Sequence, residues 1–340
     1  MNRNEGILFF NHPIAGSRNS HLGFFVALRL LGSAIICIIF LSALIIKASP
    51  LLCPLLCGRE TLPDSPPSSP AAILPASCHS HNDYWRERPL FSALEAGCVG
   101  VEADVWPYKD ELFVAHGLDT IVPNRTLKSM YLNPLLQQLD GTGRSPSSLP
   151  ATTPRGLYKS RPTQTLVLLV DFKSHPEKTW SLLMRELEPL RRSMLLTSYV
   201  SNQKIIRPIT VVVTGDIPAY LLNQDESAES RDVFLDAPLS NVQSGLYDAA
   251  NSHWASMSLA KLVGSVSSSG FSSLQLAKIR SQVRSAHDHG LQVRFWKLPT
   301  WPIGLRNKIW ASLREEGVDI LNTDDLQNAA NALREDATSQ

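Results

Sequence analysis

Residues 73–116 read ILPASCHSHNDYWRERPLFSALEAGCVGVEADVWPYKDELFVAH, a short apolar run, a helical segment and two more strand-like segments. Each of the three strand-like segments ends in residues capable of chemistry: His79 and His81, then Glu102 and Asp104, then His116. Polar residues that close a hydrophobic strand cost stability unless a site uses them. Three such endings in succession predict the mouth of a barrel, where strand ends meet.

The segment that carries Glu102 and Asp104 alternates with the period of a strand. Its two faces are expected to hold Val99, Val101, Ala103 and Val105 on one side, and Gly100, Glu102, Asp104 and Trp106 on the other. Residues 165–170, TLVLLV, are apolar on both faces, as in a buried parallel strand, and they lead directly into Asp171.

From residue 73 onward, strand-like and helix-like segments alternate, which indicates a parallel sheet covered by helices. Beyond the first three, strands are expected at 165–170, 208–214, 231–235, 254–258, 291–297 and 318–322. Helices are expected between the first two strands and at 131–139, 177–191, 274–289 and 303–316. The predicted fold class is α/β, a TIM-type (β/α)8-like barrel preceded by one transmembrane helix. Since eight strands close such a barrel, the ninth is a hairpin partner or a false assignment.

Four segments organise the chain: a polar, basic start at 1–22, an apolar segment at 23–46, a linker rich in proline and serine at 47–72, and the barrel domain at 73–335. As a helix, the apolar segment would span roughly 36 Å at ~1.5 Å per residue. That length crosses a hydrocarbon core of ~30 Å. We expect a single membrane anchor there, with a cleaved signal sequence as the alternative.

Basic residues on either side of the apolar segment predict its orientation. Arg3, Arg18 and Arg29 precede its uninterrupted part, whereas Lys47 and Arg59 follow it. The excess before it favours a cytoplasmic N-terminus. The protein is therefore expected to be membrane-anchored or in the secretory pathway, with its barrel domain lumenal or extracellular.

Overall charge and cysteine content exclude some classes of function. The net charge of +1 gives no indication of nucleic-acid binding, and nothing in the sequence indicates a protein partner. Five cysteines are too few for a disulfide scaffold, and no CxxC pair supports a zinc site. Cys78 and Cys98 are expected either as a disulfide, if the domain is exported, or as two buried thiols.

Carboxylates at the strand ends predict a metal site. Glu102 and Asp104 are two residues apart on one strand, so their Cα atoms lie roughly 6.5–7 Å apart on the same face. Asp171 would supply a third oxygen ligand. Oxygen ligands suit one hard divalent cation, Mg²⁺ in preference to Ca²⁺, rather than zinc. The competing interpretation of the E-x-D pattern is a solvated strand face.

Histidines near these carboxylates are candidates for proton transfer. His79 and His116 are expected as a general acid/base pair, because imidazole titrates near neutral pH. Lys173 shares the face of Asp171, where it would offset phosphate charge or hold the carboxylates. Trp296 would pack against a lipid or sugar part of a substrate, or in the core.

The H-x-H pair of His79 and His81 allows a second interpretation, because zinc hydrolases of the amidohydrolase type also begin with this pattern. Such sites need further histidines at later strand ends. The remaining histidines after His116 are expected in loops or at a helix end: His175, His253, His287 and His289. We therefore prefer the carboxylate site and expect His81 to bind substrate or support the site, although which of the two histidines is catalytic stays open.

These motifs together resemble the phospholipase C-like phosphodiesterase superfamily, which includes glycerophosphodiester phosphodiesterases and spider sphingomyelinase D. The similarity lies in HSHNDY at 79–84, ALEAGCVGVEADV at 93–105, His116, VDFK at 170–173 and FW at 295–296. Within it, the fungal altered inheritance of mitochondria protein 6 family is the most similar. The sequence departs from glycerophosphodiesterases in having HSHNDY where H-R-G is usual, so an arginine expected to touch phosphate is missing.

The resemblance implies a TIM-type barrel that binds one divalent ion through Glu102, Asp104 and Asp171. It places His79 and His116 at acid/base positions, and Lys173 and Trp296 at substrate positions. The expected function is a metal-dependent phosphoric diester hydrolase acting on a phospholipid or glycerophosphodiester-like substrate, by hydrolysis or through a cyclic phosphate. The alternatives are a membrane-tethered barrel that binds lipid headgroups without turnover, and a zinc hydrolase.

Overall fold

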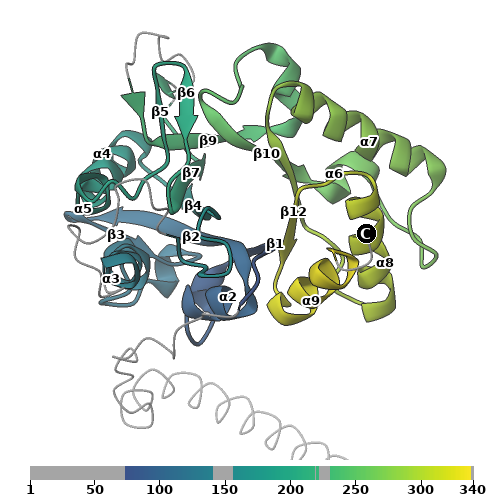
Figure 1. Cartoon of the computed structure of the whole chain (residues 1–340), viewed down its shortest axis with the longest axis horizontal. Helices are drawn as coiled ribbons and strands as arrows, with labels where there is room; N and C mark the ends of the chain where they lie inside the picture. Colours follow the sequence, from purple (N-terminus) through teal and green to yellow (C-terminus); the bar gives the residue numbers. More distant parts are fainter. Residues whose placement is uncertain (1–72, 141–155, 219, 222–229, 338–340) are drawn as a thin grey trace, which may run out of the picture. The chain divides into compact units, whose positions relative to one another are not determined.

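Eight parallel strands close into a barrel in the computed structural model, which describes residues 73–140, 156–218, 220–221 and 230–337 (Figure 1). Around the barrel the strands are β1 (Ala76–Ser80), β2 (Cys98–Tyr108), β4 (Leu166–Phe172), β7 (Ile209–Gly215), β9 (Val233–Pro238), β10 (Ser252–Ser258), β11 (Gln292–Trp296) and β12 (Ile320–Thr323). Because β1 pairs with both β2 and β12, the ring closes. The predicted TIM-type barrel is confirmed.

The ninth predicted strand, 111–116, is the hairpin partner. It forms β3 (Glu111–Val114), which pairs antiparallel with the outer part of β2 and takes no place in the ring. The hairpin turns past the end of the barrel and returns, and the backbone N–H of Ala115 donates to the carbonyl of Asp104 at 3.1 Å. His116 therefore reaches the mouth from a hairpin and not from a barrel strand.

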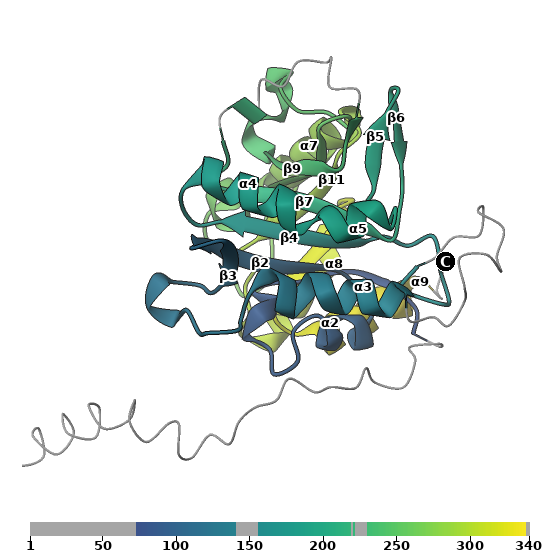
Figure 2. The same ribbon diagram turned by 90° about the vertical axis from the view of Figure 1, so that its left-hand side faces the viewer.

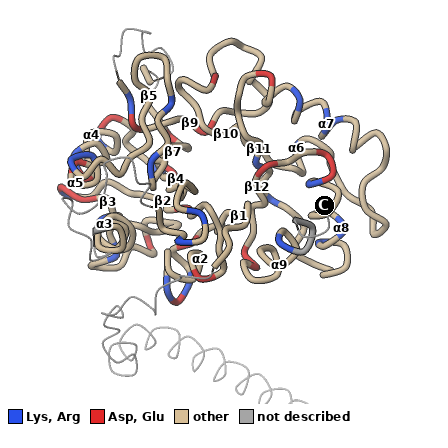
Figure 3. Tube along the Cα trace, viewed as in Figure 1, with Lys and Arg blue, Asp and Glu red and all other residues tan. Residues whose placement is uncertain are grey.

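Helices and short helical turns surround the ring (Figures 1 and 2). They are α2 (Phe91–Ala96), α3 (Asn133–Asp140), α4 (Pro176–Glu186), α5 (Glu188–Arg192), α6 (Leu259–Val263), α7 (Ser273–Asp288), α8 (Ile303–Glu315) and α9 (Leu326–Ala337), with the turns η1 (Asp83–Trp85), η2 (Leu118–Thr120), η3 (Lys128–Leu132) and η5 (Leu239–Ser244). The helix expected at 177–191 divides after Glu186, because Pro189 cannot donate the hydrogen bond of a continuous helix. Acidic and basic residues are interspersed over helices and loops (Figure 3).

A second, three-stranded sheet and the helix α9 were not expected from the sequence. The small sheet joins β5 (Ser198–Val200), β6 (Gln203–Ile205) and β8 (Ser230–Arg231), all antiparallel. These strands are two or three residues long, too short to show a period of two.

The interior of the barrel is divided between an apolar and a polar part. An inner cluster packs inside the ring: Val99, Val167, Leu169, Val212, Phe234, Trp254 and Ile320. The larger core lies outside, between the strands and the helices. Val99 was expected on the same face as Val101 but belongs to the inner cluster, because the pairing of β1 with β2 shifts register between Ala76 and His79.

The segments predicted before the barrel lie outside the described residues: the polar start at 1–22, the anchor at 23–46 and the linker at 47–72. They stay predictions. Within the described ranges, no helix has the length and apolar character needed to cross a membrane.

A disulfide joins Cys78 on β1 to Cys98 on β2. Replacing both with alanine should lower the free energy of unfolding by about 3 kcal/mol, because the bond closes a loop of 20 residues in the unfolded chain. Urea denaturation with and without reductant measures this. The wild type should lose stability on reduction and the double variant should not; equal midpoints for oxidised and reduced wild type would contradict the prediction.

Glu186, at the end of α4, accepts a hydrogen bond from the backbone of Leu112 at 3.1 Å, and its Oε2 has no partner among the described residues. Burial raises the pKa of Glu186 from 4.5 to about 7. The folded state therefore binds more protons than the unfolded state between these values, and stability falls as pH rises from about 4.5 to 7. Allowing for solvent screening, Glu186→Gln should gain about 1–2 kcal/mol at pH 8. Thermal unfolding across this pH range checks it, and parallel profiles would refute it.

Candidate active site

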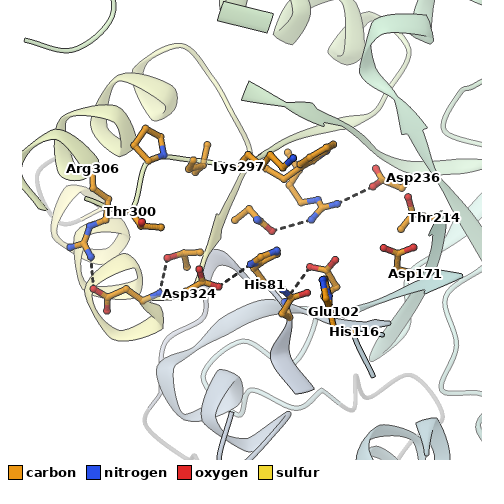
Figure 4. Close-up of a pocket in the computed structure, with 18 of the residues that line it drawn as sticks. His81, Glu102, His116, Asp171, Thr214, Asp236, Lys297, Thr300, Arg306 and Asp324 are labelled. Carbon is orange, nitrogen blue, oxygen red and sulfur yellow. Dashed lines mark hydrogen bonds and ion pairs between the residues drawn. The ribbon is translucent and has the colours of Figure 1, made fainter. Parts of the chain in front are cut away.

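A cavity of about 910 Å³ opens at the carboxyl ends of the strands (Figure 4). Barrel enzymes place their active sites at this face. Of the eight residues predicted to form a site, six line the cavity: His81, Glu102, His116, Asp171, Lys173 and Trp296. The other two, His79 and Asp104, are completely buried.

Glu102, Asp104 and Asp171 form a compact carboxylate cluster. Their ligand atoms lie within 4.8 Å of one another, because β2 and β4 are neighbours and Asp104 is in register with Asp171. Gly215 stands beside Asp171 with a positive φ of 81°, and a side chain there would collide with the Asp171 carboxylate. The Oδ1 atom of Asp104 is buried and has no hydrogen-bond partner among the described residues. A set of carboxylate oxygens with such an open acceptor fits a divalent cation.

Lys173 is bound by two of these carboxylates. Its Nζ lies 2.9 Å from Oδ2 of Asp104 and 2.6 Å from Oδ2 of Asp171. Burial opposes the charge of Lys173, but the two carboxylates outweigh it and raise the lysine pKa. The contacts support the interpretation that Lys173 holds the carboxylates in place.

The three carboxyl groups differ in the net shift of their pKa. Burial raises the pKa of Asp104, and it raises that of Asp171 to about 6 in spite of Lys173. Burial would also raise the pKa of Glu102, but His79 and Arg294 together lower it to about 2. Three carboxylates with one lysine leave an excess of negative charge, which a divalent cation would balance.

His116 is oriented by Asp104. Its Nδ1 lies 3.2 Å from Oδ2 of Asp104, which also accepts a hydrogen bond from the hydroxyl of Tyr84 at 2.8 Å. The exposed ring of Trp85 covers one side of the imidazole, with 5.1 Å between ring centroids. A proton on Nδ1 completes the bond to Asp104 and leaves Nε2 unprotonated, as a general base requires.

His79 and His81 lie in different surroundings. His79 has no exposed surface, and its Nε2 lies 3.7 Å from Oε2 of Glu102. In the described ranges neither ring nitrogen has a hydrogen-bond partner. Its ring lies edge-on to Trp254, over a position where only Gly100 leaves room. Burial lowers the pKa of His79 to about 4 despite Glu102, so this imidazole is neutral.

His81, in contrast, lines the cavity with a side chain that is 37% exposed. Its Nδ1 lies 2.9 Å from Oδ1 of Asp324, which follows β12. Burial lowers the pKa of His81, but Asp324 and Glu102 more than offset it, and the net shift is upward. Asp324 itself lines the cavity.

Two residues at the floor of the cavity were missed from the sequence. Arg294 and Asp236 form a buried ion pair with 3.0 Å between Nη2 and Oδ2. Arg294 is two residues before Trp296 on β11, so the alternation of a strand already places both on one face. Asp236 follows the apolar run of β9, a signal of the same kind as that of Asp171.

Comparison with known proteins gives two kinds of likeness. A family model described as the AIM6-like phosphodiesterase domain matches residues 68–236. The Altered inheritance of mitochondria protein 6 homolog of Arthroderma benhamiae is 39% identical over 268 residues, which cover 76% of this chain and 83% of that protein. Altered inheritance of mitochondria protein 6 of Saccharomyces cerevisiae S288c is 34% identical over 281 residues, covering 77% and 72%.

A solved glycerophosphodiester phosphodiesterase from Parabacteroides distasonis has a TM-score of 0.44 and 14% sequence identity, and the match covers 77% of this chain and 99% of that one. The assignment of the barrel rests on the strand pairings described above.

Asp171→Asn should weaken Mg²⁺ binding by about tenfold or more, because it removes one of three anionic ligands. Titration calorimetry of the metal-free protein measures the affinity. Mg²⁺ should also raise the unfolding temperature of the wild type and have less effect on the variant. Asp110→Asn, at the exposed tip of the β2–β3 hairpin, is the matched control and should bind as the wild type does. Equal affinities for Asp171→Asn and wild type would contradict a metal site here.

Proposed function

Since the chain belongs to the altered inheritance of mitochondria protein 6 family and carries an AIM6-like phosphodiesterase domain, we propose that it is a metal-dependent phosphoric diester hydrolase. One arrangement carries the proposal. A carboxylate cluster of oxygen ligands shares a cavity with two histidines, each held at Nδ1 by its own carboxylate.

Glu102, Asp104 and Asp171 would hold one divalent cation, and the compact, all-oxygen set suits Mg²⁺. When bound, the cation would neutralise charge on the phosphoryl oxygens of a diester. The described cluster contains no histidine, because His81 is engaged by Asp324 and His79 is buried under Glu102. The zinc alternative is therefore not supported.

We propose His81 and His116, rather than His79 and His116, as the proton-transfer pair. Both line the cavity, whereas His79 does not. Asp104 orients His116 so that Nε2 takes a proton from the attacking hydroxyl of water or of the substrate. The raised pKa of His81 suits it to give a proton from Nε2 to the leaving oxygen. Hydrolysis and formation of a cyclic phosphate both use this pair.

The remaining predicted residues complete a site for a phospholipid or glycerophosphodiester-like substrate. Trp296 lines the cavity and offers apolar surface, and Lys173 keeps Asp104 and Asp171 in place. An anchor at 23–46 would keep the barrel domain near a membrane, in a lumen or outside the cell. The Cys78–Cys98 disulfide supports such an oxidising compartment.

His81→Ala and His116→Ala should each lower kcat for bis(p-nitrophenyl) phosphate at least a hundredfold in the presence of Mg²⁺, since general acid/base catalysis contributes on that scale. His79→Phe keeps the ring volume and should affect unfolding temperature more than turnover. Release of p-nitrophenol gives the rates. If wild type and His116→Ala show equally negligible turnover on this diester and on a panel of lipids, the domain is a non-catalytic headgroup-binding barrel instead.

A further inference from the structure

The buried pair of Arg294 and Asp236 supplies no ligand to the metal site and no proton carrier to the mechanism proposed above. We propose that it recognises a hydroxyl group on the substrate headgroup, so that the cavity selects a polyol-bearing phosphodiester over one that ends in trimethylammonium. The inference rests on the proposed function and adds the headgroup to it.

Arg294, on β11, is anchored by residues of three other strands, β9, β10 and β12. Its Nη2 donates to Asp236 Oδ2 at 3.0 Å, its Nη1 to Asn322 Oδ1 at 3.0 Å, and its Nε to Ser256 Oγ at 3.1 Å. Its guanidinium also lies 5.3 Å from the ring of Trp254, at the top of the inner apolar cluster. The guanidinium is thus rigidly positioned at the floor of the cavity, which Arg294 and Asp236 both line.

Hydrogen-bonding capacity is left over on both partners. A guanidinium has five N–H groups, and the three bonds above leave two. Asp236 Oδ1 is buried, and within the part of the chain that the structure describes it has no hydrogen-bond partner. Burial raises the pKa of Asp236, although Arg294 and the Ser256 hydroxyl act against this shift. Both side chains are about 95% buried, at 5% and 4% exposure. An open acceptor at such a site is unfavourable unless something in the cavity donates to it.

A hydroxyl group matches what the pair offers, because it donates one hydrogen bond and accepts another. Its O–H would donate to Asp236 Oδ1 while its oxygen accepts from Arg294. A phosphate oxygen of a diester cannot donate, and Asp236 lies outside the carboxylate cluster proposed for the metal. The phosphoryl group and the hydroxyl would therefore occupy different parts of the cavity.

The aromatic lining argues against a quaternary ammonium headgroup. Such a cation binds over open aromatic faces. Two tryptophans line the cavity, and each already has a basic side chain of the protein over its ring: Lys297 Nζ lies 5.3 Å from the centroid of Trp296, and the Arg306 guanidinium 4.3 Å from that of Trp310. A trimethylammonium group would meet these charges and could make no hydrogen bond to Asp236.

Three p-nitrophenyl phosphodiesters with one leaving group test the inference: the 2,3-dihydroxypropyl, propyl and choline esters. With Mg²⁺ and the full chain, kcat/KM for the dihydroxypropyl ester should exceed that for the propyl ester at least tenfold, with the choline ester lowest. Asp236→Asn should abolish this preference, so that the dihydroxypropyl and propyl esters have similar kcat/KM values. Asp325→Asn is the control: it belongs to a second Asp–Arg pair, both of its oxygens have partners, and the preference should persist.

Arg294→Lys keeps the positive charge but loses the planar guanidinium, so it should also reduce the preference for the dihydroxypropyl ester. This variant replaces Asp236→Asn in the test if Asp236→Asn does not fold. Equal rates for the three esters in the wild type, or an unchanged preference in a folded Asp236→Asn, would overturn the inference. If the wild type turns over no diester, the proposed function fails. Calorimetry with glycerol 1-phosphate and propyl phosphate then tests the inference. Tighter binding of glycerol 1-phosphate by the wild type, with the difference lost in Asp236→Asn, supports the inference. Equal binding of the two compounds by the wild type overturns it.

Discussion

The pairing of β1 with both β2 and β12 is the constraint on which the rest of the structure depends. It closes the sheet, so that inward-facing side chains of strands far apart in the sequence share one interior. Asp171 comes close to Glu102 through the neighbouring pair β2 and β4, whereas Asp324 reaches His81 because β12 returns to β1. The Cys78–Cys98 disulfide ties β1 to β2 at the same place in the ring. Barrel closure is therefore a condition for the site.

Along the barrel axis, the apolar side chains that stabilise the fold lie apart from the charged side chains of the proposed site. The inner apolar cluster fills one part of the interior, and the charged side chains occupy the part near the mouth. Burial raises the pKa of Asp104 and Asp171, which means that the fold disfavours their charged forms. Lys173 offsets only part of this cost. Folding keeps these groups together at a local energetic disadvantage, which a bound cation would relieve.

Local pattern predicted much of the fold, because each barrel strand buries at least one face and so shows either alternation or a continuous apolar run. All nine strand positions follow from it, including the segment that turned out to be a hairpin partner. The same alternation would have found Arg294 from its spacing to Trp296. It failed for Val99, where the register of β1 and β2 shifts. The helix α9 was not predicted, although its buried residues Leu326, Ala329 and Ala330 lie at helical spacing.

The sequence by itself determined the barrel fold, the family, and the strand ends that carry the three carboxylates and the histidines, since these depend on residue type and on position along each strand. The pairing of β2 with β4 then brought Asp171 to Glu102 and Asp104. Only the tertiary structure decided which histidine faces the cavity. His79 and His81 are two residues apart, yet a β-strand and the turn after it place one under Glu102 and the other against Asp324. The pairing of Arg294 with Asp236 was likewise decided by the tertiary structure, because these residues are 58 positions apart and meet across β10, which lies between β9 and β11 in the ring.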